Sequence, residues 1–358
     1  MTHLTYLEAA VVGLIQGVSE MFPVSSLGHN VLIPALIGGS WARDLNVARP
    51  ESPYLAFIVG MHVATAIALL IYFWRDWVRI IGGFFTSLAH WQRWHPRVVT
   101  RDETLAWMII LATIPVGLVG LVAEHTFRVL FGKPILAAVF LIVNGFILYC
   151  GEKFRPRASV LADQEVAAQQ ADALASRPPG PEPLASRPPE PEPLAVPDGQ
   201  RSARRAAAPS AGHQAIRQEE ISQGLASDER LAGVGFTQAL IIGSSQILAL
   251  LAGISRDGVT MVTGMARGLS REDAARFAFL LATPVILAAG VLKVPDLTGP
   301  LGRGIHGQIL LGSVLSGVGA YLSVRFLVRY FQTRTLYPFA VYCFVFGLLS
   351  VIYLGVIK

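Results

Sequence analysis

The sequence predicts an all-α polytopic membrane protein with an inverted-topology repeat. We expect six transmembrane helices and two re-entrant helix–loop–helix segments. Hydrophobic residues make up 53% of the chain and charged residues only 15%, whereas soluble domains carry about 25% charged residues. Six apolar runs are long enough to cross a bilayer, which takes about 20 residues. Two further apolar regions are interrupted near their centres by polar residues, glycine and proline.

The first half, residues 1–151, opens with an interrupted apolar region at Tyr6–Ile37. Irregular backbone at membrane depth is tolerated only where protein or a water-filled cavity covers it. We therefore expect a helix, a loop and a second helix that enter the membrane and turn back. Three spans are predicted to follow, at Tyr54–Trp74, Thr104–Ala123 and Pro134–Cys150.

Residues 152–230 are predicted to form a disordered linker rich in proline, alanine and arginine. A ten-residue repeat begins at Leu174 and again at Leu184, with the shared pattern Leu-Ala-Ser-Arg-Pro-Pro. Proline removes a backbone donor and restricts φ, so such a stretch forms a semi-stiff spacer without a core. Binding of a partner protein is the alternative interpretation of this segment.

The second half, residues 231–358, repeats the order of the first. An interrupted region at Leu231–Leu269 precedes predicted spans at Ala275–Leu292, Gly307–Phe326 and Leu336–Ile357. Three spans per half make the second half inverted relative to the first. The interrupted regions also resemble each other, Gly-Val-Ser-Glu at 17–20 matching Gly-Ser-Ser-Gln at 243–246. Inverted repeats typically place their binding groups near the bilayer midplane.

Arginine-rich loops indicate the orientation, because positively charged loops face the cytoplasm. Two loops on the same side carry most of them: Arg75, Arg79, Arg93, Arg97 and Arg101 in one, and Arg325, Arg329 and Arg334 at the other. The linker is then cytoplasmic and both termini lie outside. The first interrupted segment enters from outside and the second from inside. The net charge of +5 is therefore read as a sign of orientation, and no nucleic-acid partner is expected.

The first interrupted segment carries two polar residues on one helix face. Gln16 and Glu20 are four positions apart in an otherwise apolar stretch. A carboxylate inside a membrane is costly and indicates a functional site. The alternative is a carboxylate at a helix end near the lipid headgroups. His62, in the first span, is interpreted as a hydrogen-bonded packing residue.

A short polar turn follows Glu20 directly. Pro23 is predicted to end the first helix. Ser25, Ser26 and Gly28 can then form a loop whose backbone N–H groups face an anion at the start of a second helix. His29 can move a proton at physiological pH. Each of these residues alone would be read as packing, but their clustering within ten positions of Glu20 predicts a site.

The second interrupted segment contains a turn suited to binding phosphate. Arg256 lies between apolar stretches, and a guanidinium offers several fixed donors that match phosphate oxygens. Ser255 and Thr260 add hydroxyl groups, and Gly253 and Gly258 allow close approach of the backbone. An arginine that extends to the membrane interface is the alternative interpretation.

These two stretches resemble the signatures of a known family. Residues 16–29, Gln-Gly-Val-Ser-Glu-Met-Phe-Pro-Val-Ser-Ser-Leu-Gly-His, are similar to the first signature of undecaprenyl-diphosphate phosphatases of the bacitracin-resistance type. Residues 252–260, Ala-Gly-Ile-Ser-Arg-Asp-Gly-Val-Thr, are similar to the second, and 277–284 continue the resemblance. The resemblance covers nearly the whole chain except the linker. Gln16 stands where glutamate is frequent, Ala252 replaces proline, and Asp257 replaces serine.

The resemblance implies hydrolysis of undecaprenyl diphosphate to the monophosphate and phosphate, which recycles a lipid carrier of wall synthesis and confers bacitracin resistance. The implied location is the bacterial cytoplasmic (inner) membrane, multi-pass, with the active site open to the outside. The expected partners are a polyprenyl diphosphate lipid and the bilayer, with a homodimer left open. The expected roles are catalysis for Glu20, Ser26, His29 and Arg256, substrate binding for Ser25, Gly28, Gly253, Ser255, Gly258 and Thr260, and binding of a divalent cation, Mg²⁺ or Ca²⁺, for Glu20, Gln16 and Asp257.

Two mechanisms and a rival function follow from these expectations. Ser26 attacks the terminal phosphorus while His29 or Glu20 takes its proton, or water attacks directly with His29 as base. Asp257 is expected to restore the carboxylate that Gln16 lacks. The rival is a lipid-phosphate flippase or anion transporter, because transporters share the inverted repeat and the midplane anion site. A scaffold that acts through the proline-rich linker is a third, weaker alternative.

Overall fold

The computed structural model describes residues 4–46, 53–91, 100–131, 133–175, 221–298 and 304–357, and these contain helices and no strand. The first half contains α1 (Tyr6–Met21), α2 (Ser26–Ile37), α3 (Gly39–Asp44), α4 (Pro53–Tyr72), α5 (Trp74–Trp91), α6 (Arg101–Phe131), α7 (Pro134–Lys153) and α8 (Arg157–Ala175). The second contains a helix at Ile221–Ala232, then α10 (Phe236–Ser244), η1 (Ser245–Leu250), α11 (Arg256–Ala266), α12 (Arg271–Thr298), α13 (His306–Thr333) and α14 (Tyr337–Ile352), extended by a π-helical turn at Tyr353–Ile357. The all-α polytopic class is confirmed.

Five helices are individually long and apolar enough to cross a membrane: α6, α7, α12, α13 and α14. They correspond to five of the six predicted spans. The sixth, α4, meets the same test only together with α5, from which it is bent by 86°. Five spans and one bent pair therefore account for the six predicted runs.

The prediction of a loop after the first span is wrong, because most of that stretch forms the helix α5. Its large apolar residues recur at helical spacing and are exposed, namely Trp74, Val78, Ile81 and Phe85. Such a stripe on a helix with a polar opposite face is typical of a helix that lies in the membrane interface. The predicted loop residues Arg93 and Arg97 lie outside the described residues.

Both interrupted regions form helix–turn–helix segments, as predicted. Helix α1 begins at a capping box between Thr5 and Glu8 and ends just before Pro23. Helix α2 then begins after the N-cap Ser25. In the second region α10 continues into the 3₁₀ helix η1, and after a short turn α11 begins at the N-cap Ser255.

Equivalent glycines bring the two halves together. Helix α1 packs against α13, and a Cβ on Gly17 would overlap the carbonyl of Ser316. Helix α10 packs against α6, and a Cβ on Gly243 would overlap the carbonyl of Ala112. The two glycines are those that the sequence comparison of 17–20 with 243–246 aligned. The division into inverted repeats remains a prediction.

The linker differs from expectation at both ends. Helix α8 occupies residues predicted to be disordered, and the helix Ile221–Ala232 begins before the predicted boundary at 230. The α8 stretch is rich in alanine and contains no proline, which favours a helix. A contact with the turn before α12 also holds α8, because the Ser159 hydroxyl donates to the Leu269 carbonyl over 2.5 Å. Residues 176–220, which include the repeat, lie outside the described residues.

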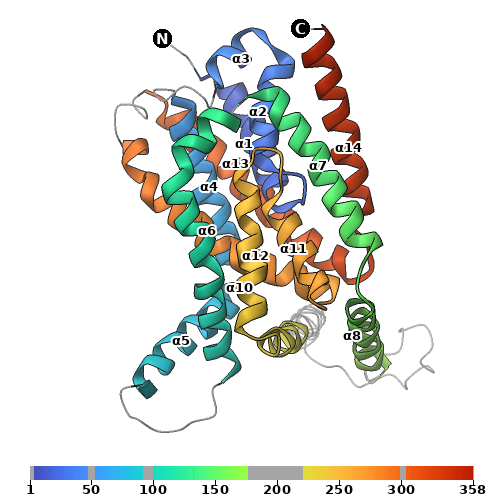
Figure 1. The fold of residues 1–358 in the computed structure, drawn as a ribbon. Coiled ribbons are helices and arrows are strands. Elements are labelled where there is room, and N and C mark those ends of the chain that lie inside the picture. The colour runs from blue at the N-terminus through green and yellow to red at the C-terminus, as the bar shows by residue number, and fades with distance from the viewer. Residues whose placement is uncertain are drawn as a thin grey trace, which may run out of the picture.

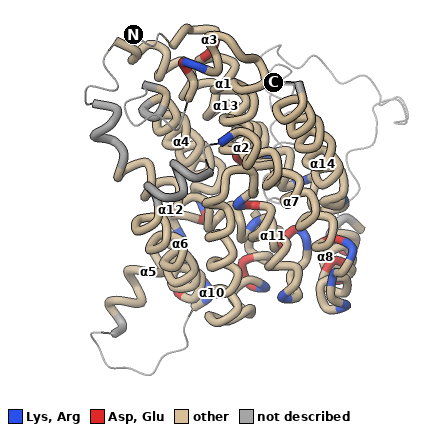
Figure 2. The backbone as a smooth tube through the Cα atoms, turned by 45° about the horizontal axis from the view of Figure 1, so that its top comes forward, with Lys and Arg blue, Asp and Glu red and all other residues tan. Residues whose placement is uncertain are grey.

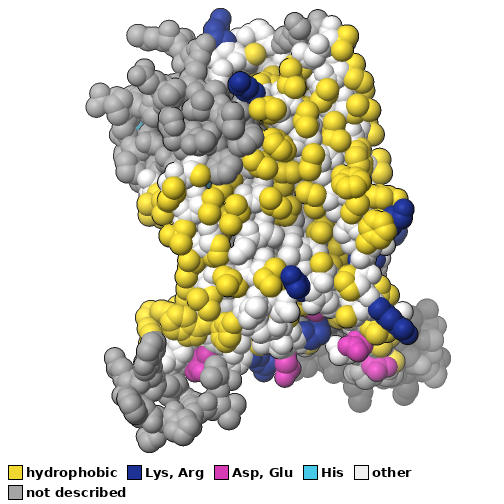
Figure 3. All heavy atoms as spheres, in the orientation of Figure 1, with side chains coloured by type: hydrophobic (Ala, Val, Ile, Leu, Met, Phe, Trp, Pro, Cys, Tyr) yellow, Lys and Arg dark blue, Asp and Glu magenta, His cyan; other side chains and the backbone are white. Residues whose placement is uncertain are grey.

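The two ends of the bundle differ in character. Helix α3 and the end of α14 lie at one end, and α5 and α8 at the other (Figure 1). Hydrophobic side chains cover much of the flank in the face shown, while acidic side chains gather at the end with α5 and α8 (Figure 3). Charged residues also lie within the bundle, near α11 (Figure 2). The site described next contains such residues.

Candidate active site

The two polar turns touch each other inside the bundle. The backbone N–H of Gly253 donates to the Ser25 hydroxyl oxygen over 3.2 Å. A Cβ on Gly28 would lie 3.0 Å from the Gly253 Cα. Gly253 has φ of +111° and packs tightly against the Ala137 carbonyl, so only glycine fits there. The turn of each interrupted segment is thus held in place by the other.

Ser25 and Ser255 cap their helices in the same way. The Ser25 oxygen accepts the Gly28 N–H over 3.2 Å, and the Ser255 oxygen accepts the Gly258 N–H over 3.1 Å. Ser25 has φ of 68°, the one positive φ of a residue other than glycine in the described chain. Backbone strain of this kind costs about 1–3 kcal/mol and clusters at functional sites. Both serines, predicted to bind substrate, therefore also define the turns.

Glu20 is the centre of the polar cluster. Its Oε1 lies 2.7 Å from Nη2 of Arg256. Its Oε2 accepts hydrogen bonds from the Gln16 amide over 2.8 Å and from the Ser26 hydroxyl. The carboxylate is almost fully buried. The structure thus brings Glu20, Ser26 and Arg256 into direct contact, although their catalytic roles remain predictions.

Asp257 lies on the other side of the guanidinium. Its Oδ1 is 3.4 Å from Nε of Arg256, and its buried Oδ2 has no hydrogen-bond partner within the described part of the chain. Arg256 therefore lies between two carboxylates. The described residues contain no cluster of three or more His, Cys, Asp or Glu that would form a metal cage.

His29 faces a different partner from the one expected. Its Nδ1 lies 2.7 Å from the Ser25 carbonyl and its Nε2 lies 2.7 Å from the Tyr342 hydroxyl. Its ring stacks on Tyr342 and Phe346. Because a carbonyl only accepts, Nδ1 carries the proton and Nε2 accepts from Tyr342. The imidazole is thus engaged on both nitrogens with α2 and α14, away from the Ser26–Glu20 contact.

Thr260 is likewise engaged locally. Its hydroxyl donates to the Arg256 carbonyl over 2.7 Å within α11. The predicted binding residues Gly28, Gly253 and Gly258 contribute through the close packing and backbone N–H groups of the turns. The predicted groups therefore lie together, but several serve first to shape the turns.

Three polar residues that sequence reasoning did not assign to the site also belong to it. Asn30 donates to Oε1 of Gln16 over 2.5 Å. His62 from α4 lies 3.3 Å from the Gln16 amide nitrogen. Asn144 from α7 donates to the Pro23 carbonyl over 3.0 Å and accepts the Ser255 N–H over 2.9 Å, so it joins both turns. In the sequence, the one signal that could have identified these residues is the presence of a polar side chain within an apolar stretch.

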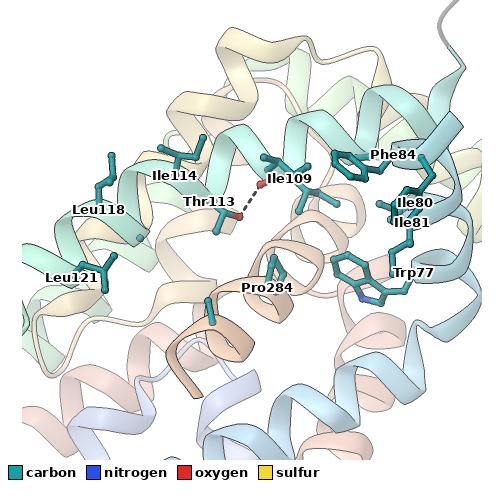
Figure 4. A pocket seen from close by; sticks show the side chains of 15 residues that line it. Trp77, Ile80, Ile81, Phe84, Ile109, Thr113, Ile114, Leu118, Leu121 and Pro284 are labelled. Carbon is teal, nitrogen blue, oxygen red and sulfur yellow. Dashed lines mark hydrogen bonds between the residues drawn. The ribbon is translucent and has the colours of Figure 1, made fainter. Parts of the chain in front are cut away.

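A separate groove of about 630 Å³ lies between α5, α6 and α12. Figure 4 shows that apolar side chains such as Trp77, Ile109 and Leu118 line it. The hydroxyl of Thr113 is turned back to the Ile109 carbonyl over 2.7 Å. No charged side chain lines this groove, so it is not the site of phosphate chemistry.

Comparison with known proteins identifies the family of the chain. Residues 9–175 and 212–349 match the family described as bacitracin resistance protein BacA. The chain is 53% identical over 353 residues to the undecaprenyl-diphosphatase of Mycolicibacterium paratuberculosis, covering 99% of this chain and 98% of that protein. It is 50% identical to undecaprenyl-diphosphatase 2 of Frankia alni, covering 98% of each chain, and 35% identical to the undecaprenyl-diphosphatase of Acidiphilium cryptum, also covering 98% of each. The chain therefore belongs to the BacA family.

Proposed function

We propose that this chain hydrolyses undecaprenyl diphosphate to undecaprenyl phosphate and inorganic phosphate. Relatives that span its whole length are named for that activity. The observation that carries the proposal is the contact of Glu20 with both Ser26 and Arg256. An acid, a hydroxyl and a guanidinium buried among apolar helices suit a substrate with an apolar tail and a highly charged head.

Arg256 supplies most of the charge that the diphosphate requires. Its Nη2 and Nε contact Glu20 and Asp257, which leaves Nη1 for oxygens of the substrate. Phosphoryl transfer depends mainly on positioning and on stabilising charge at the equatorial oxygens. Two flanking carboxylates hold the planar guanidinium in one orientation before the substrate arrives.

Ser26 is the nucleophile in this proposal and Glu20 is its base. The Ser26 hydroxyl already donates to Oε2 of Glu20, which is the geometry that an activated nucleophile needs. The Ser26 oxygen bonds to the terminal phosphorus, its proton passes to Glu20, and the bond to the bridging oxygen breaks to release undecaprenyl phosphate. Water then cleaves the phosphoserine, releasing phosphate and restoring the serine.

Direct attack by water with His29 as base is the competing mechanism. The orientation of His29 toward Tyr342 favours the serine route. In the serine route His29 anchors the start of α2 against α14 through its two hydrogen bonds.

A divalent cation, Mg²⁺ or Ca²⁺, is part of the proposal. Mg²⁺ is commonly bound through one or two carboxylates together with substrate phosphates. The buried Oδ2 of Asp257 without a partner fits one such ligand. Glu20, on the other side of the guanidinium, is the second candidate. Gln16 is a weaker candidate ligand, because its carbonyl oxygen already accepts from Asn30. The cation would supply positive charge that stabilises the phosphate oxygens.

We further propose that the site opens to the outside of the bacterial cytoplasmic membrane, where it recycles the carrier for wall synthesis. Helix α3 and the end of α14 lie at the opposite end of the bundle from α5 and α8 (Figure 1). The arginines of α5, Arg75 and Arg79, favour a cytoplasmic position for that second end. The names of the relatives favour hydrolysis over the alternative of transport.

Phosphate release by the purified protein in detergent tests the proposal. Undecaprenyl diphosphate with Mg²⁺ should yield phosphate without any gradient across a membrane. Glu20→Ala and Arg256→Ala should abolish release, whereas Glu229→Ala, at a carboxylate whose side chain is 76% exposed, should not. A purified, folded wild-type protein that binds the lipid but releases no phosphate would contradict the proposal.

A further inference from the structure

His62 contacts the centre of the site from outside both signature stretches. It lies on α4, and its Nε2 is 3.3 Å from the Gln16 amide nitrogen and 3.7 Å from Oε2 of Glu20. Its side chain is 27% exposed, more than that of either residue it contacts. A residue that served only to pack would gain more from an apolar side chain here, because the polar ring has to be hydrogen-bonded.

The hydrogen bonds of His62 fix the tautomer of its ring. Nδ1 lies 2.9 Å from the Ile58 carbonyl on the same helix. Because a carbonyl only accepts, Nδ1 carries the proton, and Nε2 of the neutral ring presents a lone pair. That lone pair faces the NH₂ group of Gln16, which can only donate. His62 therefore acts as an acceptor toward Gln16.

This acceptor acts together with Glu20 and Asn30 to orient the Gln16 amide. One N–H of Gln16 faces His62 and the other donates to Glu20 over 2.8 Å, while the carbonyl accepts from Asn30 over 2.5 Å. If the amide were reversed, its carbonyl oxygen would face the Glu20 carboxylate and its NH₂ would face the NH₂ of Asn30. Both contacts would be repulsive, and the His62 lone pair would lose its donor.

We propose that His62 is a positioning residue of the active site. It orients the Gln16 amide as a donor to Oε2 of Glu20, the oxygen that also receives the Ser26 hydroxyl. The inference rests on the proposed function, in which that oxygen takes the serine proton. His62 thus provides an acceptor for the N–H of Gln16 that does not face Glu20.

The test compares the turnover of purified variants in detergent. His62→Leu removes the acceptor at similar volume, and His62→Asn keeps a polar amide that is too short to reach Gln16. Both should lower kcat by about 10- to 100-fold, the range found when a residue that orients a direct ligand is removed. KM should change little, because Arg256 is untouched. His62→Gln, which places a carbonyl oxygen near the position of Nε2, should recover most of the activity.

A double-mutant cycle separates positioning from general damage. Because His62 acts through Gln16, His62→Leu should have almost no further effect in a Gln16→Leu background. Ile67→Leu, at an exposed apolar position on the same helix, is the control for α4. If His62→Leu fails to fold, as judged by thermal unfolding, His62→Asn takes its place in the cycle.

The outcomes distinguish the two proposals. Full additivity of the His62 and Gln16 effects, or His62→Gln no more active than His62→Leu, would overturn the positioning role while leaving hydrolysis intact. A wild type without phosphatase activity would instead overturn the proposed function. Coupled effects with rescue by glutamine would support the inference.

Discussion

Arg256 and Glu20 are 236 positions apart in the chain, yet the Arg256 Nη2 lies 2.7 Å from the Glu20 Oε1. Each residue comes from a different interrupted segment, so this ion pair joins the two halves at the site. Neither charge is isolated in the apolar interior, because the second oxygen of Glu20 and the Nε of Arg256 have further partners. Buried charges without such partners would be strongly destabilising.

Replacing Arg256 by lysine should impair catalysis although it keeps the positive charge. Lysine is a point charge, and it cannot contact Glu20, Asp257 and a phosphate oxygen at once in the planar geometry of a guanidinium. We expect a fall in kcat of about 10²- to 10³-fold, the range for losing one preorganised donor. Steady-state phosphate release measures it. Arg267→Lys, at an exposed arginine just after the same helix, is the control; equal losses in both variants would argue against a specific role for Arg256.

Ser26→Ala should abolish turnover if the serine forms the covalent intermediate. Quenching wild type with acid shortly after mixing with substrate labelled at the terminal phosphate should yield labelled phosphoserine at Ser26 by mass spectrometry. Ser244→Ala removes a hydroxyl that bonds only to its own helix, at the Leu240 carbonyl, and should be active. Near-normal turnover of Ser26→Ala would favour direct attack by water.

Asp257→Ser should weaken the dependence of activity on the divalent cation. The substitution removes one of the two carboxylates proposed to hold it and leaves Glu20 in place. The concentration of Mg²⁺ needed for half-maximal phosphate release after treatment with a chelator should therefore rise by about 10-fold or more, as for loss of a ligand or its support. An unchanged Mg²⁺ titration would remove Asp257 from the cation site.

Gly17→Ala and Gly243→Ala should both destabilise the protein. At each position the new methyl group would overlap a backbone carbonyl of the neighbouring helix, at Ser316 and Ala112 respectively. Overpacking of this kind costs about 1–3 kcal/mol. Thermal unfolding in detergent measures it. Gly117→Ala, where no atom lies within 4 Å of the new methyl group, is the matched control; similar unfolding temperatures in all three variants would refute the close approach.

Asp228→Asn should destabilise the end of the bundle that carries α5. Asp228 is fully buried, with Oδ2 2.6 Å from Nη2 of Arg79 and Oδ1 2.9 Å from Nε of Arg276. Removing its charge takes a buried carboxylate from both arginines, which keep their contacts with Asp76. We therefore expect a cost below the roughly 3–5 kcal/mol of leaving a buried charge unpaired. Glu229→Gln is the neighbouring control, because its 3.6 Å contact with Arg101 is exposed and exposed ion pairs contribute little. Equal unfolding temperatures for the two variants would contradict the prediction.

The amino-acid pattern alone predicts the fold class and the two interrupted segments. Apolar runs of sufficient length predict membrane helices whatever their neighbours are, and Pro23 breaks a helix through its own backbone. The residues of both polar turns could be named for the same reason, since Glu20 and Arg256 are conspicuous in apolar surroundings. Arg75 and Arg79 favour a loop where the structure has α5. The apolar residues from Trp74 to Phe85 recur at helical spacing and are exposed, and this pattern is typical of a helix.

Which polar groups meet depends instead on how the helices pack in three dimensions. Asn144 joins the two turns from a third helix, and His62 rather than His29 contacts Glu20, because the packing of α4 and α14 determines where each imidazole faces. No local pattern carries this information: a hydrogen bond between residues far apart in the chain depends on how the helices cross. Local sequence patterns therefore indicate the candidate residues, and the arrangement of the helices determines their partners.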